Sequence, residues 1–123
     1  MKKPLSFIAL LVIFLMSNCS EIPENNDPIL GIWARLEIVS ENDNNEDEIR
    51  EEWIFNDAFL GRYQSYTNDE LVSISDFSWS NEDGIYTIIY RDATIPGVEV
   101  RLEQAFSPEI LALQNGLTFA ERE

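Results

Sequence analysis

The chain lacks the side chains on which most hydrolytic and zinc chemistry depends. Its 123 residues contain no histidine and a single cysteine, Cys19. Without histidine, the Ser-His and Cys-His nucleophile pairs are absent, and so are the usual zinc ligand sets. Paired carboxylates could still cleave a glycosidic bond, but among 23 Asp and Glu residues such a pair is expected by chance. We therefore predict no catalytic residue, no metal, no cofactor and no enzymatic activity.

One acidic segment has part of the pattern of a calcium-binding loop. Asp43, Asn45 and Asp47 stand at alternate positions, as the first ligands of an EF-hand loop do. However, Glu48 occupies the place of the required glycine, and Ile54 occupies that of the bidentate glutamate. We therefore interpret this segment as a solvated acidic loop.

The remaining candidates for a site are large aromatic residues. A small-molecule pocket is mainly apolar, with a few polar groups that orient the ligand, and Tyr and Trp side chains supply both. The same residues could instead fill the core of a small domain, and the sequence leaves the two interpretations open. The candidate lining comprises Trp53, Phe55, Tyr63, Phe77, Trp79, Tyr86, Tyr90, Phe106 and Phe119.

The first eighteen residues have the composition of a secretory signal. Lys2 and Lys3 form a basic start, residues 5–16 are apolar or small, and a short polar pair follows. The apolar run is shorter than the roughly 18 residues that a membrane-spanning helix needs. We therefore expect residues 1–18 to be a signal peptide that is removed.

The end of this signal resembles the lipobox of bacterial lipoproteins. Leu15 or Met16 supplies the apolar position, Ser17 the small one and Cys19 the acylated one, while Asn18 departs from the usual Gly, Ala or Ser. The resemblance implies cleavage before Cys19, a diacylglyceryl group on its thiol and acylation of the new amino terminus. It therefore implies a protein that is held to the membrane by its N-terminal lipid.

The part of the chain that would remain after cleavage is strongly acidic. Residues 19–123 contain six arginines, no lysine and all 23 acidic residues, which gives a formal charge of −17. Such a charge repels phosphate backbones, so we expect no nucleic-acid partner. Ser20 in place of aspartate gives no sign of inner-membrane retention. We therefore expect the cell envelope, at the outer membrane, facing either the periplasm or the surface.

The chain after the signal predicts one all-β domain. Residues 19–28 contain two prolines and no aromatic residue, which indicates a flexible tether after the lipidated cysteine. In residues 29–123, short runs of β-branched and aromatic residues alternate with turn residues, and sequence neighbours should pair antiparallel. Closure as a small up-and-down barrel would bury one apolar face of each strand. The eight predicted strands are residues 30–40, 50–56, 61–67, 71–79, 85–91, 98–106, 109–113 and 117–122.

Two hairpins have side chains that suggest a register. A four-residue loop, residues 81–84, would pair Trp79 with Tyr86 and Phe77 with Ile88, which places the large aromatics on one face. Near the C-terminus, a three-residue loop over residues 114–116 with a left-handed glycine would place the large apolar side chains of the last two strands on one face. It pairs Leu113 with Leu117 and Leu111 with Phe119.

Two other strands predict which side chains face the core. In residues 98–106 the alternation places Val98, Val100, Leu102 and Phe106 on one apolar face. In residues 30–40 the apolar face consists of Ile32, Ala34, Leu36 and Ile38, with Trp33 on the opposite side.

The first strand also carries a pattern that is similar to one in a known superfamily. Gly31-x-Trp33, followed by this order of strands, resembles the lipocalin-like domains of bacterial lipoproteins. There the tryptophan plugs one barrel end under a basic residue of the last strand, which implies a Trp33 and Arg122 pair here. The resemblance implies binding of a small apolar or amphipathic molecule in the barrel. The alternative is a solid barrel whose loops contact an envelope protein or a glycan.

Overall fold

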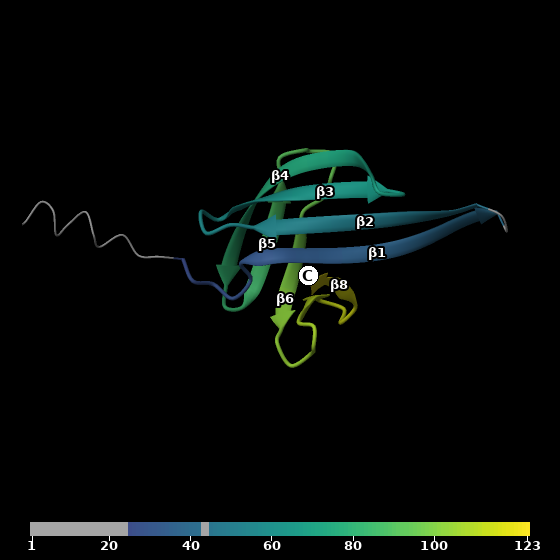
Figure 1. Cartoon of the computed structure of the whole chain (residues 1–123). Helices are drawn as coiled ribbons and strands as arrows, with labels where there is room; N and C mark the ends of the chain where they lie inside the picture. Colours follow the sequence, from purple (N-terminus) through teal and green to yellow (C-terminus); the bar gives the residue numbers. More distant parts are fainter. Residues whose placement is uncertain (1–24, 43–44) are drawn as a thin grey trace, which may run out of the picture.

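The computed structural model describes residues 25–42 and 45–123. The predicted signal peptide, Cys19 and most of the predicted tether lie outside the described residues, as does Asp43. The described part consists of strands and their connections (Figure 1). The strands are β1 (Gly31–Asn42), β2 (Asn45–Phe55), β3 (Leu60–Thr67), β4 (Glu70–Glu82), β5 (Ile85–Tyr90), β6 (Val98–Glu103), β7 (Ile110–Leu113) and β8 (Thr118–Arg122).

The eight strands form a closed antiparallel barrel. Each strand pairs with its neighbour in sequence, and β8 returns to β1 through the pairs Trp33 with Arg122 and Ala34 with Glu121. The predicted fold class is therefore confirmed, and every predicted strand overlaps an observed one. The barrel follows from strands that each have one apolar face, because closure buries those faces.

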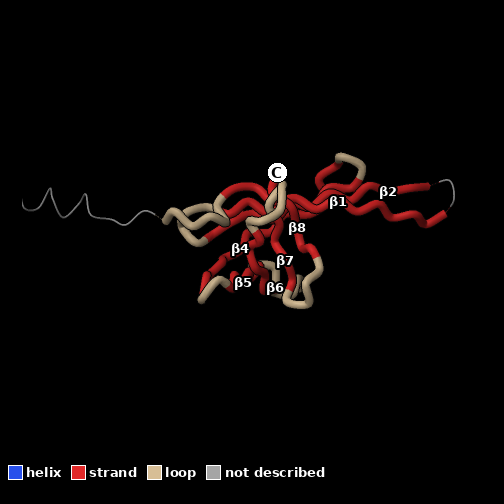
Figure 2. Tube along the Cα trace, turned by 90° about the horizontal axis from the view of Figure 1, so that it is seen from below, coloured by secondary structure: helices blue, strands red, loops and turns tan. Residues whose placement is uncertain are grey.

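One hairpin is much longer than the barrel requires. β1 and β2 stay paired from Gly31 with Phe55 to Asn42 with Asn45. Their outer halves project beyond the other strands, which both views of the chain show (Figures 1 and 2). The barrel therefore has one end that is bordered by this projecting hairpin and one end near the start of the described chain.

The β4–β5 hairpin differs from its predicted register. The turn consists of Asp83 and Gly84, which both have positive φ angles, 54° and 86°. This two-residue turn matches the twist of the flanking strands, and it pairs Trp79 with Ile88 rather than with Tyr86. The prediction was therefore wrong by two residues. A shift of two leaves every side chain on its predicted face.

The β7–β8 hairpin contains the predicted loop but not the whole predicted register. The Leu113 N–H donates to the Leu117 carbonyl at 2.8 Å, and the loop glycine has a φ of 88°. The register then shifts within β8, so that Leu111 pairs with Ala120 and not with Phe119. This bulge, which the sequence did not reveal, leaves both Phe119 and Ala120 buried.

The predicted core face of the first strand is on the outside of the barrel. Trp33 is fully buried, whereas Ile32, Leu36 and Ile38 are 41%, 60% and 64% exposed. Neighbouring residues of a strand face opposite sides, so either the tryptophan or the aliphatic series can point inward. The indole is the largest of these side chains and it finds a hydrogen-bond acceptor inside, at the Ile29 carbonyl. Burial of the indole therefore stabilises the barrel more than burial of the aliphatic side chains would.

Two further sequence predictions differ from the structure at the ends of elements. β6 ends at Glu103, so Phe106 lies in the following loop and is 57% exposed. Its predicted place in the barrel lining was wrong, because the alternation that placed it there stops with the strand. Residues 25–28, predicted as part of the tether, contact the barrel: the Tyr86 hydroxyl donates to Asp27 at 2.5 Å, and Asn81 donates to Asp27 at 2.9 Å.

Candidate functional site

The interior of the barrel contains the aromatic residues that the sequence proposed as a lining. All of them except Phe106 are buried or half-buried. They come from β2, β3, β4, β5 and β8, whose alternation points them to one side. The buried residues are Trp53, Phe55, Phe77, Trp79, Tyr86 and Phe119, and the half-buried ones are Tyr63 and Tyr90.

These rings pack against one another. The ring centroids of Trp53 and Phe119 are 4.6 Å apart, and those of Phe55 and Phe77 are 5.0 Å apart. Trp79 lies edge-on to Phe55 at 5.8 Å. These are the distances and tilted arrangements of rings in direct contact in a protein core. The rings of the predicted lining are therefore in direct contact with one another.

The polar atoms of these aromatic residues have partners within the protein. The Trp33 indole N–H donates to the Ile29 carbonyl at 2.8 Å, and that of Trp53 donates to the Tyr90 hydroxyl at 2.8 Å. The Trp79 N–H donates to the Asn56 carbonyl in the β2–β3 connection and to the Leu60 carbonyl at the start of β3. Within residues 25–42 and 45–123, no buried side-chain nitrogen or oxygen lacks a partner. A bound ligand is therefore not needed to satisfy this interior.

A small polar cluster lies beside the rings, toward the projecting hairpin. Arg35 donates to Glu51 at 2.8 Å, and the Tyr63 hydroxyl donates to the same carboxylate at 3.2 Å. The guanidinium of Arg35 lies 5.2 Å from the centroid of the Trp53 ring. Burial, and then the Glu51 charge, raise the pKa of Tyr63 to about 12, while burial also raises the pKa of Tyr90. The charges of this cluster are therefore paired internally.

The opposite end of the barrel is closed by Arg122. Its guanidinium lies 4.3 Å from the centroid of the Trp33 ring, in the arrangement that the lipocalin resemblance implied. It also donates to the carbonyls of Leu30 at 3.0 Å and Pro28 at 2.5 Å, and to the Glu109 carboxylate at 2.9 Å. One side chain thus joins β8 to the start of the described chain and to the β6–β7 connection.

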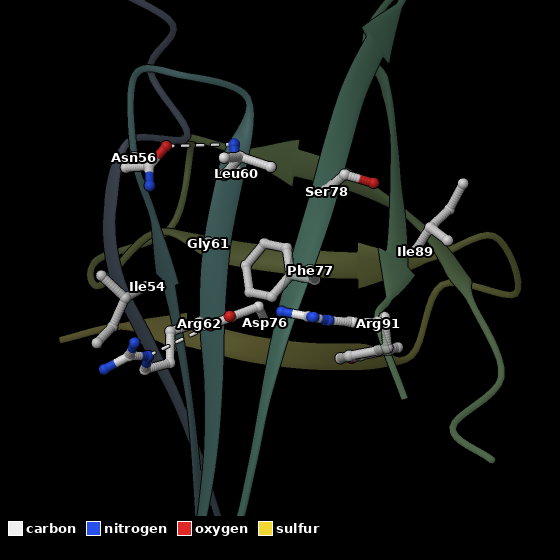
Figure 3. Close-up of a pocket in the computed structure, with 11 residues that line it drawn as sticks. Ile54, Asn56, Leu60, Gly61, Arg62, Asp76, Phe77, Ser78, Ile89 and Arg91 are labelled. Carbon is white, nitrogen blue, oxygen red and sulfur yellow. Dashed lines mark hydrogen bonds and ion pairs between the residues drawn. The ribbon is translucent and has the colours of Figure 1, made fainter. Parts of the chain in front are cut away.

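A hollow of about 690 Å³ lies on the outer surface of β2–β5 (Figure 3). One row of cross-strand neighbours in it is largely apolar, because Leu60 pairs with Ser78 and Ser78 pairs with Ile89. Leu60 and Ile89 are both more than half exposed. The short side chain of Ser78 between them leaves a depression flanked by two aliphatic residues. We call this the apolar row.

The adjacent row of the same hollow carries charge. Ile54 pairs with Arg62, and Arg62 pairs with Asp76, with an ion pair of 3.4 Å between their side chains. Arg91 follows β5, donates its backbone N–H to the Asp76 carbonyl at 2.8 Å, and directs its guanidinium toward Asp76 (Figure 3). Among the described residues Arg91 has no ion pair within 4.0 Å. This charged row therefore has two cations and one anion.

Of the residues that line this hollow, the sequence predicted only Phe77 and Tyr90 as site residues, and it predicted them as lining of the barrel interior. Arg62, Asp76 and Ile89 occupy the outward positions of their predicted strands. Their proximity depends on the register of β3, β4 and β5. The β4–β5 register was predicted two residues out, so the outward neighbours could not be matched.

The described residues show neither a metal site nor a membrane-spanning helix. No group of three or more acidic or cysteine residues within them could hold a metal ion. No helix in that part of the chain is long and apolar enough to cross a membrane. Comparison of the chain with protein-family models, with curated proteins and with solved structures found no match.

Proposed function

We propose that the protein is a lipid-anchored, non-catalytic binding module of the cell envelope, with a filled barrel that serves as a scaffold and a partner that binds outside it. The observation that carries this proposal is the contact between the aromatic rings of the interior, above all Trp53 with Phe119 at 4.6 Å. Of the two functions that the lipocalin resemblance left open, this favours the solid barrel over the internal pocket.

The energetics of the interior support the same choice. A ligand inside the barrel would have to separate ring pairs that each contribute about 0.5–1.5 kcal/mol beyond their burial. It would also have to replace the hydrogen bond from Trp53 to Tyr90, and a buried donor left without a partner costs about 1–3 kcal/mol. A pre-formed pocket would impose neither cost.

The proposed anchor is Cys19, on the basis of its lipobox-like surroundings. Five residues separate it from Asn25, where the described chain begins. At about 3.5 Å per residue, they hold the barrel within roughly 20 Å of the acylated cysteine. Asp27 accepts hydrogen bonds from Tyr86 and Asn81 of the barrel. The short segment before it therefore keeps the barrel close to the proposed anchor. The proposed module therefore works near a membrane surface.

Two measurements test the two parts of this proposal. Membrane fractionation of a Cys19→Ser variant should release the protein, and continued membrane association would exclude the acyl anchor. Fatty-acid-like ligands should leave the methyl NMR signals of Ile88 and Leu111, which are fully buried, unchanged. Saturable shifts of those two signals would restore the internal pocket.

A further inference from the structure

We propose that the hollow on the outer face of β2–β5 is a binding site for a small amphipathic carboxylate. The carboxylate would lie between Arg62 and Arg91, and the apolar body would lie along the apolar row, Leu60, Ser78 and Ile89. This inference rests on the proposed function in one respect, which is that the barrel is filled and its partner binds outside.

Exposed aliphatic side chains also occur elsewhere on the barrel, for example at Leu36, Ile38 and Val72. What sets the apolar half of this site apart is the hollow in which it lies and the arginines that line the same hollow. In an antiparallel sheet with one buried face, the other face is normally polar because water covers it. Here Leu60 is 52% exposed and Ile89 is 59% exposed, and both line the hollow. Removing this surface from water favours binding of an apolar group.

The charged half of the site determines whether a ligand must be an anion or a cation. Residues 19–123 carry a formal charge of −17, so most of the surface repels an anion. In the hollow, however, Arg62 and Arg91 outnumber Asp76, and the 3.4 Å ion pair engages only the Nε atom of Arg62. A guanidinium presents its N–H groups as a planar fork that matches a carboxylate. Asp92 lies with these three residues in the adjoining depression, where its carboxylate accepts from the Thr94 N–H and hydroxyl. The lining of the hollow itself therefore has two cations and one anion, which is complementary to one anionic head group.

The spacing of the two rows fits a small molecule. Arg62 is two residues from Leu60 on β3, and Asp76 is two residues from Ser78 on β4, which separates the rows by about 7 Å. The apolar row crosses three strands, or about 10 Å. The volume of about 690 Å³ lies within the 300–1,000 Å³ of small-molecule sites. One molecule can therefore reach both rows, with its head group at one and its body at the other.

The test uses the lipidated protein in nanodiscs of zwitterionic lipid, with the methyl groups of leucine and isoleucine labelled for NMR. Octanoate is the probe, octylammonium the charge-reversed control, and empty nanodiscs correct for partitioning. Octanoate should shift the methyl signals of Leu60 and Ile89 saturably, and octylammonium should bind at least tenfold more weakly. Equal affinity for the two probes would overturn the charge complementarity.

Variants then assign the head-group contact. Arg62→Gln and Arg91→Gln should each weaken octanoate binding at least fivefold. Arg101→Gln is the matched control, because Arg101 is also exposed and has no ion pair within 4.0 Å among the described residues. It should change the affinity less than twofold. Loss of affinity in all three variants alike would mean a general charge effect and would overturn the site.

The location of the shifted methyl groups separates failure of this site from failure of the filled barrel. Shifts at Ile88 and Leu111, which are both fully buried, would place octanoate inside the barrel and would contradict both proposals. No saturable shift at any methyl group would overturn the outer site alone and leave the filled barrel standing.

Discussion

Replacement of Arg122 by glutamine should destabilise the barrel more than an ordinary surface substitution. The arginine stacks on Trp33 at 4.3 Å and donates to the Leu30 and Pro28 carbonyls and to Glu109. It also belongs to one of the two residue pairs that join β8 to β1. Glutamine is too short to keep the stacking and the three hydrogen bonds together.

The size of the effect follows from these contacts. A partly exposed cation–π contact contributes about 1 kcal/mol. The side chains of Arg122 and Glu109 are only about a quarter exposed, and a net contribution of about 0.5–1 kcal/mol for each of the three hydrogen bonds is a restrained figure. The sum is about 3 kcal/mol of unfolding free energy. For a domain of this size that corresponds to a fall in Tm of roughly 15 °C.

Urea unfolding followed by tryptophan fluorescence measures this loss, with calorimetry as a second probe. Arg101→Gln is the control, and it should change the unfolding free energy by less than about 0.5 kcal/mol because its side chain is exposed. A loss below about 1 kcal/mol for Arg122→Gln would refute the reasoning, since it would mean that the barrel end is held by other contacts.

Two further predictions concern a close backbone approach and alkaline pH. A Cβ at Gly61 would overlap the Phe77 ring and the Ile54 carbonyl oxygen, so Gly61→Ala should cost about 3 kcal/mol in urea unfolding. Gly84→Ala, which meets open space at a φ of 86°, should cost only about 1 kcal/mol; equal costs would argue against the overlap. Because the pKa of Tyr63 is about 12 when folded and near 10 when unfolded, stability should fall between pH 10 and 12. Tyr63→Phe should show a smaller fall over that range, and an identical fall would contradict the raised pKa.

The alternation of apolar residues was sufficient to predict the strands and the barrel. Each strand has a face that must be buried, and short turns leave few ways to arrange eight such strands. The register of the β4–β5 hairpin was harder to predict from the sequence. The Asp83-Gly84 pair is a strong two-residue turn signal, yet a longer loop also aligned the aromatic residues. Both choices bury the same face, so hydrophobic pattern alone could not separate them.

The facing of β1 and the outer hollow depend on tertiary contacts. Ile32, Leu36 and Ile38 outnumber Trp33 in any count of apolar residues along the strand. The direction was decided by an acceptor at Ile29, four residues before Trp33, and by a cation from β8, which is remote in sequence. The charged row likewise combines residues of three strands, so it can be predicted only when the registers of those strands are known.

Hydrogen exchange of the three tryptophan indole N–H groups, measured by NMR with and without saturating octanoate, tests the filled barrel most directly. Each indole N–H is bound within the protein, at Ile29, at Tyr90 and at the β2–β3 connection. A filled barrel predicts slow exchange for all three indole N–H groups, both without octanoate and when octanoate occupies the outer hollow. Rapid exchange of Trp53, or exchange that becomes faster as octanoate binds, would contradict it.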